Sequence, residues 1–173
     1  MKKLLLLITV LFFGISTANA QIEKASEGTI YEVMFTPNLE AAGQFALQEG
    51  HIVRRTLNGD DTATRWKAHF SFLSVDGDDN DDMTFGLMYG KEKHHDGSTR
   101  LATYQGWEGG LLYSDINGND ATAISGGVFV GANYYIANNL YIGTEINFSV
   151  ALGEETIAMG PGVKGMLTLG WKM

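Results

Sequence analysis

Apolar residues alternate with polar or small residues along most of this chain. The segment 162–173 shows the pattern well, because Leu167, Leu169 and Trp171 share one parity while Lys164 and Thr168 share the other. A period of two places successive side chains on opposite faces of a β-strand. Over the whole chain the same pattern predicts eight strands, at 28–36, 44–58, 64–75, 83–93, 100–114, 123–136, 140–152 and 162–173.

The two faces of these predicted strands differ in chemistry. In the segment 64–75, Trp66, Phe70 and Phe72 lie on one face, and Lys67 and His69 lie on the other. Several aromatic residues fall near predicted strand ends, where a membrane barrel carries its aromatic girdles. We predict lipid-facing aromatic side chains at Tyr31, Phe35, Trp66, Phe70, Phe72, Phe85, Tyr89, Trp107, Tyr134, Phe148 and Trp171.

The second predicted strand, 44–58, fits this scheme least well. Glu49 and His51 share parity with the apolar residues Phe45, Leu47 and Val53. Either a β-bulge shifts the parity within the strand, or this part of the strand emerges into the lipid headgroup region. Both explanations remain open at the level of the sequence.

Alternation alone does not say which face lies inside, because a soluble barrel of the lipocalin kind has the same period with its apolar face inward. The chain contains nine Phe, seven Tyr and three Trp residues, and most of them lie on the apolar face. An eight-stranded barrel has room inside only for ordinary side-chain packing, so this bulk favours the outer face. Charged residues make up 18% of the chain, against roughly 25% in ordinary soluble domains. The sequence therefore predicts an all-β, eight-stranded antiparallel up-and-down transmembrane β-barrel.

If the aromatic face meets lipid, the opposite parity places charged side chains in the lumen. These residues are Glu32, Arg54, Lys67, Glu108, Glu145 and Lys164. They form either an ion-paired plug or a charged constriction that acts as a gate. Eight strands favour the plug, since water-filled porin channels need roughly 16 strands.

The beginning of the chain has the features of a cleavable signal peptide. Lys2 and Lys3 precede an apolar run, and Ala18-Asn19-Ala20 supplies small residues at the cleavage site. We predict a signal peptide at 1–20, cleavage between Ala20 and Gln21, and one barrel domain at 21–173. All 20 acidic residues follow Ala20, so removal of Lys2 and Lys3 by cleavage changes the formal charge from −8 to −10. This negative charge argues against nucleic acid as a partner.

The predicted connections alternate in length, which sets the expected topology. The shorter links are Asn58–Thr64, Lys93–Thr99 and Ala137–Asn139, and they are typical of periplasmic turns. The links that we expect to face outside the cell are on average longer, at Pro37–Gly43, Asp76–Asp82, Asp115–Thr122 and Gly153–Pro161.

Three groups of residues are candidate sites of chemistry. His69 and Ser71 share a strand face, but a serine hydrolase also needs an acid to orient the histidine and donors for an oxyanion. The acidic run Asp76–Asp82 lacks the residue order of an EF-hand and fits a solvated loop, with weak divalent-cation binding as the alternative. His94 and His95 point in opposite directions on an extended chain. We predict no catalytic residue, no cofactor and no metal site.

Four segments carry a resemblance to a known family: Phe85–Lys93, Trp107–Leu111, Tyr134–Ile146 and Leu167–Lys172. With them the chain resembles the outer membrane protein β-barrel domain family, whose small barrels are related in architecture to the transmembrane domain of outer membrane protein A. The resemblance implies an eight-stranded outer-membrane barrel and supplies no catalytic residue. It also implies contact with outer-membrane lipid and lipopolysaccharide, and with the barrel-assembly machinery during biogenesis.

The expected function is that of a non-enzymatic, monomeric outer-membrane barrel with a side-chain-filled lumen, acting in envelope integrity or surface interaction. One alternative is a narrow porin-like channel or small-solute transporter. A second is a soluble periplasmic binding barrel of the lipocalin type, and a third is a lipid-modifying enzyme that uses Ser71.

Overall fold

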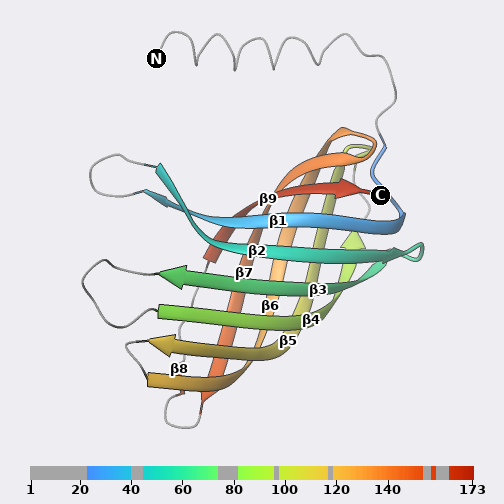
Figure 1. Ribbon diagram of the computed structural model, residues 1–173. Coiled ribbons are helices and arrows are strands. Elements are labelled where there is room, and N and C mark those ends of the chain that lie inside the picture. The colour runs from blue at the N-terminus through green and yellow to red at the C-terminus, as the bar shows by residue number, and fades with distance from the viewer. Residues whose placement is uncertain are drawn as a thin grey trace, which may run out of the picture.

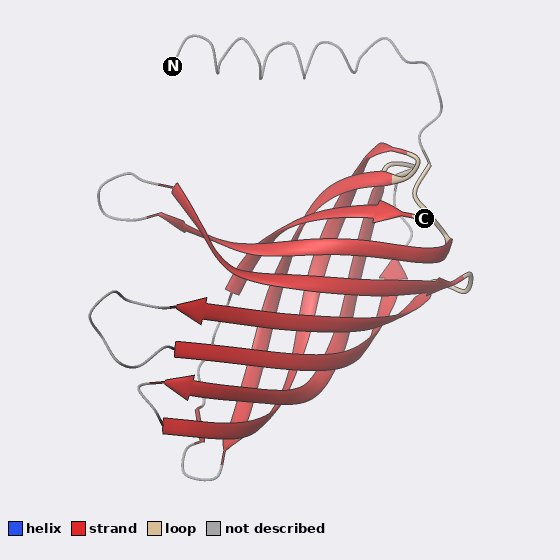
Figure 2. Ribbon diagram, in the orientation of Figure 1, coloured by secondary structure: helices blue, strands red, loops and turns tan. Residues whose placement is uncertain are grey.

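The computed structural model describes residues 23–39, 45–73, 82–95, 98–116, 119–153, 157–158 and 164–173. These residues form strands and short links (Figures 1 and 2). The strands are β1 (Glu27–Leu39), β2 (Phe45–Asn58), β3 (Thr62–Leu73), β4 (Asp82–His95), β5 (Leu101–Ile116), β6 (Asn119–Ala137), β7 (Leu140–Gly153), β8 (Ile157–Ala158) and β9 (Lys164–Lys172). Within this described part of the chain, no helix has the length and hydrophobicity needed to span a membrane.

Eight of the strands close into an antiparallel barrel. Each of β1 to β6 pairs with the next strand along the chain. The barrel closes through β9, which pairs with both β7 and β1. β8 is a two-residue extension that pairs with β7. The predicted eight-stranded antiparallel barrel is therefore confirmed.

The hairpin of β5 and β6 extends further than the alternation of side chains indicates. The predicted link 115–122 is largely strand, since Asp115 pairs with Asp120 and Ile116 pairs with Asn119. The backbone ladder continues here through polar residues, because ladder hydrogen bonds do not depend on side-chain hydrophobicity. Residues 117–118 lie outside the described set, as do the acidic run at 76–81 and the signal peptide with its cleavage site at Ala20 and Gln21.

The links β2–β3, β4–β5 and β6–β7 lie at the end of the barrel where β1 begins and β9 ends, and we call this the turn end (Figure 1). The β2–β3 link is a tight turn in which Gly59 has φ 83° and Asp61 has φ 59°. The Thr62 hydroxyl donates to Asp60 Oδ1 at 2.5 Å and accepts from Asn58 Nδ2 at 3.0 Å. This hydroxyl lowers the pKa of Asp60 below its usual value, so the charged form that caps the turn persists in mild acid.

A β-bulge interrupts β2. Phe35 of β1 pairs with Gly50, but the next residue, Thr36, pairs with Gln48, which leaves Glu49 as an extra residue in β2. A single extra residue turns every following side chain to the opposite face. The bulge resolves the ambiguity of this strand in the sequence.

The bulge corrects the prediction for Arg54. Beyond Glu49, Val53 and Arg55 are fully buried in the barrel, whereas Ile52 is 63% exposed and Arg54 projects outward. Parity that continues unchanged from Phe45 and Leu47 through the strand predicts Arg54 in the lumen, and the extra residue Glu49 reverses it. The interior cation of β2 is instead Arg55.

The exterior of the barrel is apolar, and its interior holds many charged and polar side chains beside apolar ones. Large hydrophobic side chains that are 44–65% exposed include Ile52, Phe70, Leu87, Leu111, Ile124, Val128, Ile142 and Phe148. The buried residues include Glu32, Arg55, Arg65, Lys67, Glu92, Glu108, Asn133, Glu145 and Asn147. This distribution is the reverse of that in a soluble protein.

Buried apolar side chains close the turn end below the charged interior. Ile30, Leu57, Tyr135 and Tyr141 belong to one cluster there. The segment before β1 adds to it through Ala25, which packs against the cluster. In the same segment, Lys24 N donates to Thr99 O at 2.7 Å. Thr99 precedes β5, which lies four strands from β1, so this segment crosses the end of the barrel.

Two interior tyrosines lie directly against glycines on the neighbouring strand. A Cβ atom at Gly131 would lie 2.3 Å from Tyr104 Cζ, and one at Gly170 would lie 2.1 Å from Tyr141 Cζ. Both glycines are the ladder partners of the tyrosines that cover them. The absence of a side chain at these positions lets each ring lie flat against the inner wall, where its hydroxyl reaches the charged residues.

We expect Gly170→Ala to destabilise the barrel by about 1–3 kcal/mol, because the added methyl group overpacks the Tyr141 ring. Gly165→Ala on the same strand is the matched control, since a Cβ there meets no atom within 4 Å. Urea unfolding of both variants in lipid vesicles measures the difference. Equal stability of the two variants would contradict the described packing of Tyr141.

Candidate functional site

Seven charged side chains gather in the barrel interior. They come from six strands and are 0–5% exposed. The residues are Glu32 of β1, Arg55 of β2, Arg65 and Lys67 of β3, Glu92 of β4, Glu108 of β5 and Glu145 of β7. We refer to these seven residues as the interior charge network. It contains four carboxylates and three cations.

Arg65 is the most connected member of the network. Its guanidinium donates to both carboxylate oxygens of Glu145, at 2.7 and 3.1 Å. It also lies 3.0 Å from Glu108 Oε2 and 3.3 Å from Glu92 Oε1. The planar fork of an arginine suits such bidentate pairing, which a lysine would not reproduce. Arg65 thus links β3 to β4, β5 and β7 across the lumen.

Arg55 forms the second centre of the network. Its Nε lies 2.8 Å from Glu92 Oε2 and its Nη1 lies 2.9 Å from Glu32 Oε2. The same Nη1 donates to the Tyr141 hydroxyl at 2.9 Å, and that hydroxyl donates in turn to Glu32. Glu92 accepts from both arginines, so it joins the two centres.

Lys67 is the third cation of the network, and Asn147 and two aromatic rings contact network residues. Lys67 Nζ pairs with Glu108 Oε1, which also accepts from Asn147 Nδ2 at 2.7 Å. The guanidinium of Arg65 lies 4.0 Å from the centre of the Phe129 ring, and that of Arg55 lies 4.5 Å from the Tyr104 ring. Each cation therefore has an anionic partner, and both arginines are also stacked on a ring.

The near-zero exposure of these residues shows that the lumen is filled at this level. Buried ions are costly unless paired, and removing one partner of a buried pair typically costs about 3–5 kcal/mol. Cross-strand pairing offsets the cost of burial here. The arrangement can hold the wall together from inside and obstruct the passage of water and ions.

The sequence prediction located part of this network. Glu32, Lys67, Glu108 and Glu145 lie inside the barrel as expected by parity, and Arg54 lies outside. Lys164 lies in β9, but its side chain is not among those described.

The predicted set of lumen charges lacks three members of the network: Arg55, Arg65 and Glu92. Arg65 has the parity of Lys67, and Glu92 has the parity opposite to Phe85 and Tyr89, so extending the alternation would have found both. Arg55 required knowledge of the bulge.

The aromatic residues predicted to face lipid alternate with buried residues along their strands. Trp66, Phe70, Phe85, Trp107, Tyr134 and Phe148 are 45–60% exposed on the outer surface. Tyr31, Phe35, Tyr89 and Trp171 are partly exposed. Phe72 lies in β3, and its side chain is not described.

Three of the four histidines occupy two places on the inner face. The ring centres of His51 and His69 lie 4.7 Å apart on neighbouring strands. His94 Nε2 lies 3.1 Å from Glu92 Oε2, whereas His95 is exposed on the other face. Among the described residues no cluster of three or more His, Asp or Glu side chains has the geometry of a metal site. The Ser71 side chain, the nucleophile of the enzyme alternative, is outside the described set.

This closed barrel, with its apolar exterior and charged interior, has the fold of the small eight-stranded outer-membrane barrels. The sequence matches no family model and no curated relative. Among solved structures, the chain is similar to Neisserial surface protein A, with a TM-score of 0.53 and 17% identity over 86% of this chain and 98% of that chain.

Two further solved structures are similar. The N-terminal β-barrel domain of Pseudomonas aeruginosa OprF gives a TM-score of 0.47 and 15% identity, covering 84% of this chain and 96% of that chain. Ail, the attachment invasion locus protein of Yersinia pestis, gives 0.44 and 13%, covering 83% of this chain and 96% of that chain.

We expect Arg55→Met to destabilise the folded barrel by about 3–5 kcal/mol, because it leaves Glu32 buried without its cation. Arg54→Met is the matched control at the next position. Removing an outward arginine from the apolar outer surface is expected to be neutral, or to stabilise the barrel in lipid by up to about 4 kcal/mol. Urea unfolding in vesicles tests both variants, and a larger loss for Arg54→Met would contradict the bulge at Glu49.

Proposed function

We propose that this chain is a non-enzymatic outer-membrane β-barrel that contributes to envelope integrity or to interactions at the cell surface. The observation that carries the proposal is the reversed distribution of side chains, with exposed hydrophobic residues outside and paired charges inside. An exterior of this kind is stable in lipid and would aggregate in water.

A row of interfacial side chains supports the membrane location. Trp171, Tyr31, Arg54, Trp66 and Tyr89 are successive ladder partners around one side of the barrel. The rings of Tyr31 and Trp171 have centres 6.4 Å apart, and those of Trp66 and Tyr89 are 5.1 Å apart. Exposed aromatic rings and a long arginine side chain are compatible with contact to lipid and to headgroups, so this row agrees with a membrane location.

The filled lumen favours a structural or surface role over transport. The arginines and glutamates that block the lumen are held by several partners each, and the apolar cluster at the turn end adds a second obstruction. The name of the Neisserial relative describes a surface protein, which agrees with this role. In this proposal, contacts with partners are made by the exterior and by the loops.

The proposed location predicts a heat-dependent change in gel mobility. A closed barrel resists detergent until it is boiled, so the unboiled protein from the membrane fraction should migrate differently from the boiled protein. A soluble binding barrel, the alternative with an inverted surface, would instead remain in the aqueous fraction without detergent and show no shift.

Planar-bilayer recordings separate the plug from the narrow channel. We expect the reconstituted protein to give no stable conductance steps, because the charge network excludes water from the lumen. Stable steps whose ion selectivity changes in Glu108→Gln would contradict the plug and support a channel. Gly165→Ala, which alters only the outer face, serves as the control for reconstitution.

A further inference from the structure

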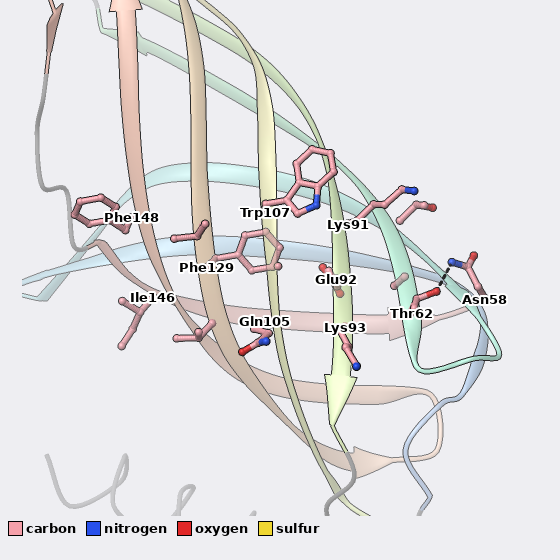
Figure 3. A pocket seen from close by; sticks show the side chains of 15 residues that line it. Asn58, Thr62, Lys91, Glu92, Lys93, Gln105, Trp107, Phe129, Ile146 and Phe148 are labelled. Atoms are coloured by element: carbon pink, nitrogen blue, oxygen red, sulfur yellow. Dashed lines mark hydrogen bonds between the residues drawn. The ribbon is translucent and has the colours of Figure 1, made fainter.

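A groove of about 770 Å³ crosses the outer surface of the barrel from β3 to β7 (Figure 3). Its walls are two rows of outward side chains. Lys91, Trp107, Val128 and Phe148 are successive ladder partners in one row, and Lys93 belongs to the other. The volume lies within the range of roughly 300–1,000 Å³ that is typical of small-molecule sites.

The groove changes in chemistry along its length. Lys91 and Lys93 lie on one side of the hollow in Figure 3, and Ile146 and Phe148 lie on the other. Lys93 is two residues from the end of β4 at His95, so it lies near the turn end. Phe148 is eight residues into β7, away from that end.

The length of the groove matches the depth of one lipid layer. With a rise of about 3.3 Å per residue and a strand tilt of about 40°, Lys93 lies roughly 5 Å and Phe148 roughly 20 Å from the turn end along the barrel axis. The difference of about 15 Å is half the hydrocarbon thickness of a bilayer. A molecule with a polar end and an apolar chain would follow the groove from the membrane surface inward.

The cationic end of the groove is available to an anion. Lys91 and Lys93 are both exposed on the outer face, and the ion pairs among the described residues involve neither of them. Glu92 lies between them in the sequence but points into the barrel, where it pairs with Arg55 and Arg65. The two lysines therefore present positive charge outward from an otherwise acidic chain.

We propose that this groove binds an anionic glycerophospholipid, with its phosphate at Lys91 and Lys93 and an acyl chain laid past Trp107 and Val128 towards Phe148. The inference rests on the proposed membrane location. A phospholipid fits better than lipid A, because the lysines lie at the turn end, which the predicted topology places on the periplasmic side.

Fluorescence quenching by brominated lipids tests the proposal, because Trp107 forms part of the groove wall. The double variant Trp66→Phe/Trp171→Phe leaves Trp107 as the single tryptophan. In mixed vesicles, brominated phosphatidylglycerol should quench Trp107 in preference to brominated phosphatidylcholine. A lysine beside an anionic lipid is worth roughly a fivefold preference. In this background, Lys91→Gln/Lys93→Gln should abolish the preference, and Arg54→Gln, which removes an outward cation on β2 away from the groove, should leave it unchanged.

The possible results separate this proposal from the proposed function. Equal quenching by the two lipids, or a preference that survives loss of both lysines, would overturn the lipid site while leaving membrane insertion intact. A preference for brominated lipid A over phosphatidylglycerol would also overturn it. Absence of quenching by every brominated lipid, in protein that still shows the heat-dependent shift, would contradict the lipid-facing position of Trp107 and with it the proposed location.

Discussion

The pairing of buried charges across the lumen is the interaction on which the rest of this structure depends. Arg65 contacts glutamates from three other strands, and Arg55 contacts two. A slip of one residue in any of these strands would turn its charge to the apolar exterior and leave its partner unpaired inside. The network and the backbone ladder therefore specify the same register, without a disulfide, since the chain has no cysteine.

Local sequence patterns predict much of this barrel, but the bulge in β2 and the choice of ion-pair partners depend on contacts between strands. The eight strands follow from an alternation that each segment carries by itself, and parity is enough to place Glu32, Glu108 and Glu145 inside. The bulge at Glu49 is different, because the residues around it fit either face, and only pairing with β1 decides between them. The choice of partners, such as Arg65 with Glu145, depends on closure of the barrel and is invisible to a single strand.

The interior and the exterior of the barrel differ in the variety of their side chains. The residues of the interior charge network pair with one another. Gly131 and Gly170 leave room for Tyr104 and Tyr141, whose hydroxyls donate to Glu145 and Glu32. The exterior is more varied, with an aromatic row, an outward arginine and a groove that carries two lysines. The interior contacts join the strands, whereas the more varied side chains lie on the outer surface.

The most direct test is to measure whether the outer face of the barrel contacts lipid or water in vesicles. The chain has no cysteine, so single substitutions such as Val128→Cys and Ile142→Cys can each carry one nitroxide spin label. The account predicts that both labels collide often with oxygen, which partitions into lipid, and rarely with a water-soluble nickel complex. Frequent collision with the nickel complex at both positions would contradict the account, because it would place the apolar face in water.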